Sequence, residues 1–190
     1  MTNSSEPADW QVDEPRQLLE TPIGTITAGR LFHRIRQKER TFYRLEAPDW
    51  VNIIARTPSA EIVLIRQFRY GSRQVEVEIP GGAVDPGETP EAAGTRELLE
   101  ETGFAGDPPL MLGWVKPNPA LQNNRCYTVL IDQARQVTPP AFDEMEDISS
   151  FLIHEAEIFK AVATQPITHG LVLNALHWFR LWREENSSRS

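Results

Sequence analysis

The stretch from Gly81 to Phe104 reads GGAVDPGETPEAAGTRELLEETGF and carries the clearest structural signals of the chain. Thr89 before Pro90 is typical of a helix start, because a threonine hydroxyl caps free N–H groups and proline fits the first helical position. Gly103 is a natural stop, because glycine adopts the left-handed conformation at a helix end without strain. The stretch therefore predicts a turn-rich loop followed by a helix from about Pro90 to about Thr102.

Three glutamates project from one side of this predicted helix. Glu97 precedes Glu100 by three residues and Glu101 by four, which puts their side chains on neighbouring turns. Like charges at this spacing repel, whereas hard divalent cations prefer clusters of carboxylate oxygens. Arg96 lies four residues before Glu100 and is placed to hold it by an ion pair. Taken alone, such a run is more often an ordinary solvated helix face, so a metal site needs further support.

Alternating apolar and polar residues predict strands on both sides of the helix. In Gln74–Ile79 aliphatic residues alternate with Gln74, Glu76 and Glu78, so one face would join the core and the other would face water or a site. Further elements are expected in chain order: two or three short strands within Ile23–Leu45, strands at Trp50–Ala55, Ile62–Ile65, Leu110–Val115, Cys126–Ile131 and Ile148–Ile153, and helices at Glu155–Ala163 and from His169 onward. This order indicates a mixed sheet with helices packed on it.

Length and composition limit the function classes. The 190 residues, 40% of them hydrophobic, fit one compact domain or one domain with a modest N-terminal addition. A net charge of -8 argues against nucleic-acid and membrane-surface binders, which need a basic footprint. No apolar run approaches the roughly 18 to 20 residues that span a bilayer. The segment MTNSSEPADWQVDEP has neither a basic start nor an apolar core, so we expect no targeting peptide and a cytoplasmic location.

The spacing of particular residues in the opening stretch matches a known motif. They are Gly82, Glu88, Arg96, Glu97, Leu98, Glu100, Glu101, Gly103 and Phe104. This pattern occupies every fixed position of the Nudix box, so the chain resembles the Nudix hydrolases. The resemblance implies an α+β fold, an α/β/α sandwich whose mixed sheet has flanking helices, with a small antiparallel N-terminal β segment added. It also implies an enzyme that uses Mg²⁺, or Mn²⁺, to hydrolyse a nucleoside diphosphate linked to another group.

The resemblance assigns roles within the box. The implied metal ligands are Glu97, Glu101, Glu100 and the backbone carbonyl of Gly81. Arg96 would orient the acids and, with Glu100, belongs to the implied catalytic group. Glu88 would brace the loop or assist a metal. A bound divalent cation would then link an acidic protein to an anionic diphosphate.

Outside the box, VLIRQFRYG at 63–71 and EVEIPGG at 76–82 resemble the ADP-ribose and nucleotide-sugar diphosphatase branch. The implied substrate contacts are Arg69, Arg66, Glu78, Trp50 and Pro119. A guanidinium suits bidentate phosphate binding, although a surface ion pair explains either arginine as well. A solvated strand face remains the alternative for Glu78, and a core position the alternative for Trp50.

Members of this branch often carry the general base on a loop before a late strand. The corresponding loop here is Phe142–Asp147, in which Glu146 aligns best and Glu144 is the second candidate for the general base. A merely acidic surface loop is the alternative, because a base must also reach the attacking water.

The resemblance also implies a domain organisation and an assembly. Residues 1–46 would form an N-terminal β-rich dimerisation segment, and 47–186 the Nudix hydrolase domain, in a homodimer. Aromatic residues of the N-terminal region would clamp the base, unless they are core residues. The candidates are Trp10, Phe32, Tyr43 and Trp50.

Together these features predict hydrolysis of nucleoside diphosphate sugars, with ADP-ribose, cleaved to AMP and ribose 5-phosphate, as the first candidate. A nucleoside triphosphate or dinucleoside polyphosphate hydrolase and a non-catalytic nucleotide-sugar sensor are the alternatives. The histidines show no metal-ligand spacing, so each is expected at the surface or with its polar atoms satisfied. They are His33, His154, His169 and His177. Cys126, the single cysteine, is expected to be a small buried residue.

Overall fold

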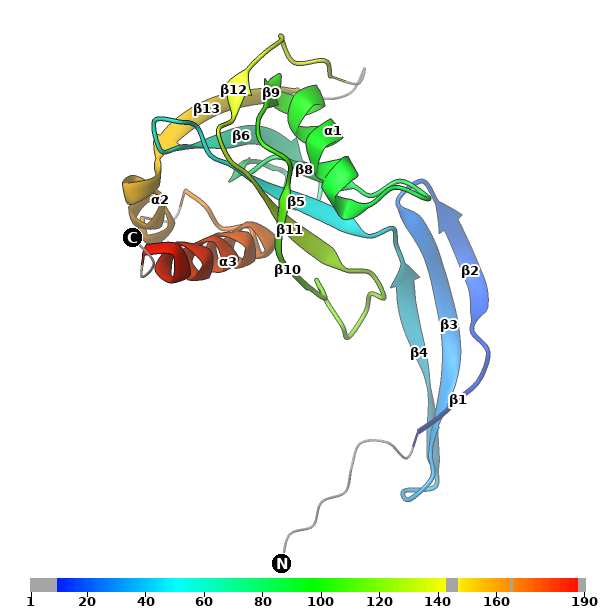
Figure 1. The fold of residues 1–190 in the computed structure, drawn as a ribbon. Helices are drawn as coiled ribbons and strands as arrows, with labels where there is room; N and C mark the ends of the chain where they lie inside the picture. Colours follow the sequence, from blue (N-terminus) through cyan, green and yellow to red (C-terminus); the bar gives the residue numbers. More distant parts are fainter. Residues whose placement is uncertain (1–9, 143–146, 165, 188–190) are drawn as a thin grey trace, which may run out of the picture. The chain divides into compact units, whose positions relative to one another are not determined.

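The structure is a computed structural model that describes residues 10–142, 147–164 and 166–187 (Figure 1). These residues divide into two compact units. The N-terminal unit comprises 10–48 together with 116–124, and the second unit comprises the remainder. The first junction lies next to the predicted boundary at 46/47, whereas the loop 116–124, expected in the second domain, belongs to the N-terminal unit.

The N-terminal unit is an antiparallel sheet built around its longest strand, β3 (Gly24–His33). Strand β4 (Lys38–Glu46) pairs with β3 over its whole length, and β2 (Arg16–Thr21) and β1 (Trp10–Val12) pair with successive parts of β3. The sequence predicted the strands after Ile23 but not β1 and β2. Every residue of β1, and all but the last of β2, is exposed, so neither strand shows the alternation that marks a half-buried strand.

The second unit contains a four-stranded mixed sheet and a three-stranded antiparallel sheet. The mixed sheet has the order β10 (Leu110–Val115), β11 (Cys126–Ile131), β5 (Trp50–Ala55) and β8 (Gly81–Ala83), with β11 and β5 parallel. The other has the order β13 (Ile148–His154), β6 (Glu61–Arg69) and β7 (Gln74–Glu78). Two short strands, β9 (Phe104–Ala105) and β12 (Arg135–Gln136), also pair. The helices are α1 (Pro90–Thr102), α2 (Glu155–Ala163) and α3 (Gly170–Ser187).

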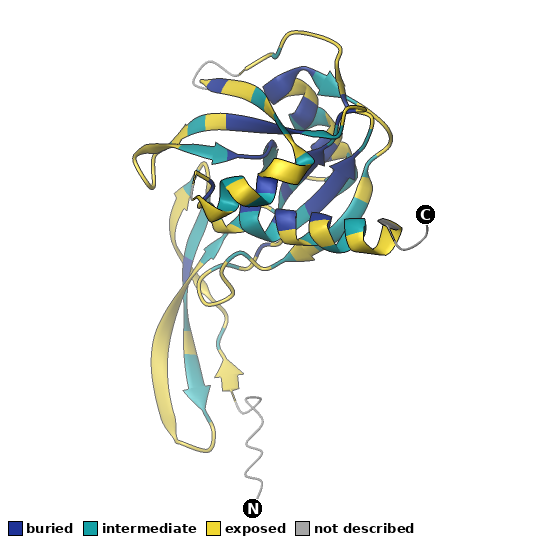
Figure 2. Ribbon diagram, turned by 90° about the vertical axis from the view of Figure 1, so that its left-hand side faces the viewer, coloured by how far each residue is buried: buried dark blue, intermediate teal, exposed yellow. Residues whose placement is uncertain are grey.

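Both faces of strand β5 are buried, which sets the layering of this unit. Figure 2 shows that the buried residues are concentrated in the strands and helices of the second unit. Val51, Ile53 and Ala55 belong to one apolar cluster, together with Ala93 and Leu98 of α1. The intervening Ile54 belongs to a second cluster with residues of α2 and α3. Successive side chains of a strand point to opposite faces, so helices cover both sides of the sheet. This arrangement confirms the predicted α/β/α sandwich of the α+β class.

Strand β7 departs from its predicted alternation. Val75 is 62% exposed, whereas Glu78 on the opposite face is only 3% exposed. The polar face of β7 therefore lines an interior site at Glu78, and the apolar face loses its cover toward the start of the strand. Cys126 is 2% exposed, as expected. No helix in the described part of the chain is long and apolar enough to cross a bilayer.

Candidate active site

Helix α1 has the predicted boundaries, and its ends position the acidic side chains. The Thr89 hydroxyl accepts a hydrogen bond from the Ala92 N–H at 3.2 Å. At the other end Gly103 has φ of 73° and donates its N–H to Leu99 O. The helix also lies close to the sheet, because a Cβ at Gly94 would come within 2.8 Å of a Val129 methyl group. The carboxylates of the last two turns are therefore carried on a capped and tightly packed element.

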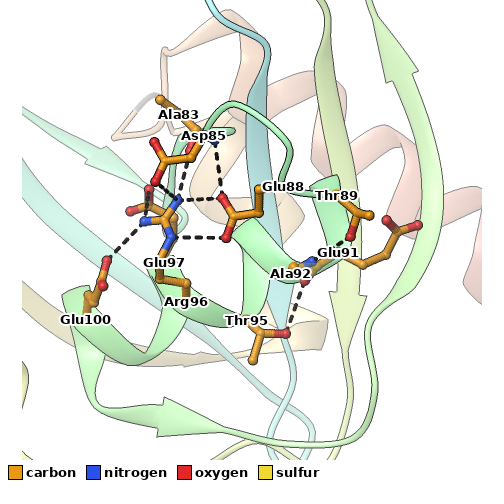
Figure 3. A network of polar contacts seen from close by, with 10 residues as sticks. All are labelled: Ala83, Asp85, Glu88, Thr89, Glu91, Ala92, Thr95, Arg96, Glu97 and Glu100. Carbon is orange, nitrogen blue, oxygen red and sulfur yellow. Dashed lines mark hydrogen bonds and ion pairs between the residues drawn. The ribbon is translucent and has the colours of Figure 1, made fainter.

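Arg96 is the centre of a group that we call the Arg96 cluster: Arg96, Glu88, Glu97 and Glu100 (Figure 3). Its guanidinium donates to both Glu88 oxygens, at 3.2 and 3.0 Å, to Glu97 at 2.8 Å and to Glu100 at 3.1 Å. It also donates to the Ala83 carbonyl at 3.0 Å, which ties the loop to the helix. The predicted ion pair between Arg96 and Glu100 is confirmed. The structure adds ion pairs of Arg96 with Glu88 and with Glu97.

The Arg96 cluster carries a net negative charge, which favours the binding of a cation. The Glu88 carboxylate, followed by Glu97 and Glu100, raises the pKa of the Arg96 guanidinium despite partial burial. The hydrogen bond from Arg96 in turn lowers the pKa of Glu88. One guanidinium thus faces the three carboxylates of the cluster, and Asp85 Oδ2 lies 3.9 Å from its Nη2. This excess of negative charge is suited to attract a cation.

Glu97 and Glu101 both reach the backbone of Gly81 and Gly82. Glu101 is 4% exposed, and its Oε2 accepts the Gly81 N–H at 2.9 Å. A Cβ at Gly82 would lie 2.2 Å from Glu97 Oε1, so only glycine leaves room for that carboxylate. The two principal ligands implied by the resemblance both lie beside the glycine backbone, whose Gly81 carbonyl is a further implied ligand.

The residues fit a divalent cation as a partial ligand set. Within residues 10–142, 147–164 and 166–187, no three acidic, histidine or cysteine side chains form a ready metal-binding group. The hydrogen bonds of Arg96 to Glu97 and Glu100 explain this in part, because they orient these carboxylates toward the guanidinium. Mg²⁺ keeps several waters and is usually held by one or two carboxylates plus substrate phosphate, which two carboxylates beside a glycine backbone can supply.

A cavity of about 670 Å³, the main cavity, adjoins this site. Four predicted site residues line it, namely Trp50, Arg69, Glu78 and Gly81. Arg66 is not among the lining residues; it is exposed, and its guanidinium lies 3.9 Å from the centroid of the Phe151 ring. Pro119 lines a smaller cavity of about 310 Å³ in the N-terminal unit. Glu144 and Glu146 lie outside the described residues.

Glu78 is the centre of a second group, the Glu78 cluster: Glu78, Arg69 and His169. Arg69 donates to both Glu78 oxygens, at 2.9 Å from Nε and 2.7 Å from Nη2. Nδ1 of His169 lies 3.4 Å from Glu78 Oε2. Burial acts to raise the pKa of Glu78, but the hydrogen bonds from Arg69 and the contact with His169 outweigh it and lower that pKa to about 2. Glu78 is therefore ionised at neutral pH, and its exposure of only 3% excludes the predicted alternative of a solvated strand position.

The lining residues that were not singled out from the sequence as site residues include Asn52, Thr168 and His169. Thr168 donates its hydroxyl to Glu76 at 3.3 Å, His169 contacts Glu78, and Asn52 donates to the Leu171 carbonyl at 3.2 Å. Together these contacts attach the start of α3 to strands β7 and β5. Their partners lie far away in the chain, so no local pattern could have shown them. The sequence predicted a surface or satisfied position for His169. Its side chain is 40% exposed, but its Nδ1 is buried and makes no hydrogen bond to a described residue.

Comparison with known proteins identifies this arrangement. The model of the NUDIX domain matches residues 48–169, which include α1, the Arg96 cluster and most of the residues that line the main cavity. The chain belongs to the Nudix family. The Nudix box of the sequence is therefore the structural motif that holds Glu97 and Glu101 against the Gly81–Gly82 backbone.

Several Nudix relatives are similar to this chain. The ADP-sugar pyrophosphatase of Mus musculus is 31% identical over 115 residues, which cover 58% of this chain and 53% of the relative. The ADP-ribose pyrophosphatase of Bacillus subtilis strain 168 is 42% identical over 57 residues, covering 30% and 31%. The chain thus spans about half or less of the length of these relatives. A solved structure described as an ADP compounds hydrolase has a TM-score of 0.81 at 20% identity, covering 94% of this chain and 96% of the other, and shows the same fold.

Proposed function

We propose that this Nudix protein is a divalent-cation-dependent diphosphatase of nucleoside diphosphate sugars, with ADP-ribose as its first substrate. The observation that carries the proposal is the meeting of Glu97 and Glu101 at the Gly81–Gly82 backbone, beside a cavity of about 670 Å³. The names of the mouse and Bacillus subtilis relatives support the choice of substrate. In the reaction, water adds to one phosphorus and the bond to the bridging oxygen breaks, giving AMP and ribose 5-phosphate.

Glu97, Glu101 and the Gly81 carbonyl would hold the cation, with Glu100 as a further ligand. When bound, Mg²⁺ or Mn²⁺ supplies positive charge that polarises the phosphoryl group and helps a water molecule lose its proton. The chain's own contribution is to orient the acids. Arg96 keeps Glu97 and Glu100 in position through its hydrogen bonds, and Gly81 does the same for Glu101 through its N–H.

The substrate would occupy the main cavity. The Trp50 indole offers a stacking surface for a base or a sugar, and Arg69 and Glu78 offer polar contacts. Arg66 and Pro119, which do not line this cavity, stay predictions from the resemblance. Removal of the proton from water needs a base within hydrogen-bond reach, and Glu146, with Glu144 as reserve, keeps that proposed role. Loss of activity in Glu146→Gln but not in Glu144→Gln would support the first assignment.

The N-terminal unit is proposed to form a homodimer. Trp10 and Phe42 are 41% and 42% exposed, with ring centroids 6.4 Å apart, and Tyr43, next to Phe42 in β4, is 59% exposed. A contiguous exposed apolar patch is typical of an interface. Sedimentation of the intact protein tests this proposal, which predicts twice the monomer mass. Tyr43→Lys should shift the protein to the monomer, and a wild-type monomer at all concentrations would contradict the assembly.

Turnover of a substrate panel tests the function. ADP-ribose, ADP-glucose, a dinucleoside polyphosphate and dGTP are incubated with the intact protein and Mg²⁺, and the products are separated by anion exchange. The proposal expects the highest kcat/KM for ADP-ribose or ADP-glucose and no reaction in EDTA. Preference for dGTP or the dinucleoside polyphosphate would favour the alternative hydrolases. Tight binding of ADP-ribose without any product would indicate a sensor.

A further inference from the structure

His169 forms part of the wall of the main cavity, directly before α3 begins at Gly170. Its Nδ1 is buried 3.4 Å from Glu78 Oε2, whereas 40% of the side chain as a whole is exposed. The exposed surface therefore belongs to the other ring atoms, on the edge that carries Nε2. One ring nitrogen is held inside the protein against a carboxylate, and the opposite edge is available to the cavity.

The position of Glu78 decides which ring nitrogen carries the proton. Glu78 is 3% exposed and ionised, and an ionised carboxylate favours a hydrogen on the nitrogen that faces it. At 3.4 Å the contact is electrostatic rather than an aligned hydrogen bond. The negative charge of Glu78 still attracts an N–H group more than a nitrogen lone pair. The neutral imidazole then carries its hydrogen on Nδ1, which leaves Nε2 as an acceptor.

The charges of this wall favour a hydroxyl group over a phosphate. Arg69 pairs with both oxygens of Glu78, so their charges largely offset each other. Glu76 lies two residues earlier on the same face of β7, and it also lines the cavity. Glu76 accepts a hydrogen bond from the Thr168 hydroxyl, which brings no positive charge. A phosphate would be repelled by this carboxylate, whereas sugar hydroxyls donate readily to a carboxylate and to an imidazole acceptor.

We propose that His169 is a specificity-determining residue, whose Nε2 accepts a hydrogen bond from a ribose hydroxyl of the substrate. Glu78 sets the tautomer, and Glu76 is placed to accept from the neighbouring hydroxyl of the same vicinal diol. This inference rests on the proposed function, in which the main cavity binds a nucleoside diphosphate sugar. The diol can belong to the nucleoside ribose or to the terminal ribose, since both present the same chemistry.

The test compares ADP-ribose with two analogues, one lacking the 2-hydroxyl of the nucleoside ribose and the other lacking that of the terminal ribose. In the wild type, the analogue without the contacted hydroxyl should have a KM about five- to tenfold higher, with kcat little changed, because a bond made equally in ground and transition states affects KM alone. In His169→Ala the KM for ADP-ribose should rise by the same factor. The difference between ADP-ribose and that analogue should disappear.

Two conservative variants distinguish recognition of the ribose hydroxyl by Nε2 from support of Glu78 by Nδ1. A glutamine amide can place its oxygen near the position of Nε2, whereas an asparagine amide reaches only the position of Nδ1. We expect His169→Gln to restore discrimination between ADP-ribose and the analogue, and His169→Asn to behave like alanine. His177→Ala changes an exposed histidine within α3, and it is the matched control that should behave like the wild type.

Restored discrimination in His169→Asn, or unchanged discrimination in His169→Ala, would overturn the proposal. Equal loss for ADP-ribose and both analogues, with no change in their ratio, would do the same, because it would indicate a structural role alone. If the wild type hydrolyses none of these compounds, the proposed function fails. Calorimetric binding of ADP-ribose and the analogues to the same variants with Mg²⁺ would then still decide whether His169 recognises the hydroxyl.

Discussion

The Arg96 cluster and the Glu78 cluster use the same kinds of side chain in opposite proportions. In the first, one guanidinium faces three carboxylates, and in the second, one carboxylate faces a guanidinium and an imidazole. The first keeps an excess of negative charge, which suits a divalent cation. The second offsets its buried charge internally, which suits a neutral group such as a hydroxyl. Proportion and burial, rather than residue type, thus separate a proposed metal site from a proposed sugar site.

The largest effect is expected from a substitution of Glu101, a ligand of the proposed metal site. Glu101→Gln keeps an oxygen that can accept the Gly81 N–H but removes the charge, so the fold should persist while cation binding weakens. We expect kcat/KM for ADP-ribose to fall about 10²- to 10³-fold, the effect of removing one preorganised electrostatic group. Steady-state kinetics measure the loss, and Glu157→Gln, an exposed acid on α2, is the control. Undiminished turnover would remove Glu101 from the metal site.

The second cluster is best tested through acid stability. The pKa of Glu78 is lowered from 4.5 to about 2 in the folded state, so its contribution is present above about pH 4.5 and is lost as the pH falls toward 2. We expect the free energy of unfolding to lose on the order of 3 kcal/mol over this range from Glu78 alone.

Urea denaturation at a series of pH values measures this contribution. In Glu78→Gln the decrease between pH 4.5 and 2 should be smaller by about that amount. The same slope in wild type and variant would mean that Glu78 is not held as an ionised partner of Arg69.

A smaller change tests the geometry of the first cluster without altering its charge. Gly82→Ala would place a methyl group 2.2 Å from Glu97 Oε1 and force that carboxylate away from its position. We expect the affinity for Mn²⁺ or Mg²⁺ to fall about ten- to a hundredfold, as when the support of a ligand is lost. Calorimetric titration measures it, with Gly29→Ala as the control, since a Cβ there meets only ordinary contacts of 3.7 Å or more. Unchanged affinity would mean that Glu97 is not a ligand.

The smallest effect concerns the apolar part of the main cavity. Trp50→Leu removes an aromatic surface but no charge, so we expect the KM for ADP-ribose to rise about two- to tenfold with a steady kcat. A fall in kcat alone would instead connect Trp50 to the chemistry of the first cluster, because Trp50 pairs with Ala83 next to the glycine backbone.

Much of the first cluster could be predicted, because its geometry is local. Thr89 and Gly103 predicted both ends of α1, and helical spacing placed Glu97, Glu100 and Glu101 on one side. The other features depend on contacts between residues far apart in the chain, which the sequence does not reveal. The sequence showed that Glu78 lies on the polar face of a strand, but not that Glu78 is buried or that it contacts His169. The exposed strands β1 and β2 were missed because they show no alternation at all.

By itself, the sequence determined the Nudix box, the helix that carries it and the acidic residues suited to a cation, because these depend on spacings of three and four residues along one element. Only the tertiary structure decided that Gly82 must leave room for Glu97, that Glu78 is buried and ionised, and that His169 belongs to the cavity wall. The physical reason is that each of these facts depends on packing between elements that are distant in the chain. Burial and charge pairing are properties of that packing and not of any local pattern.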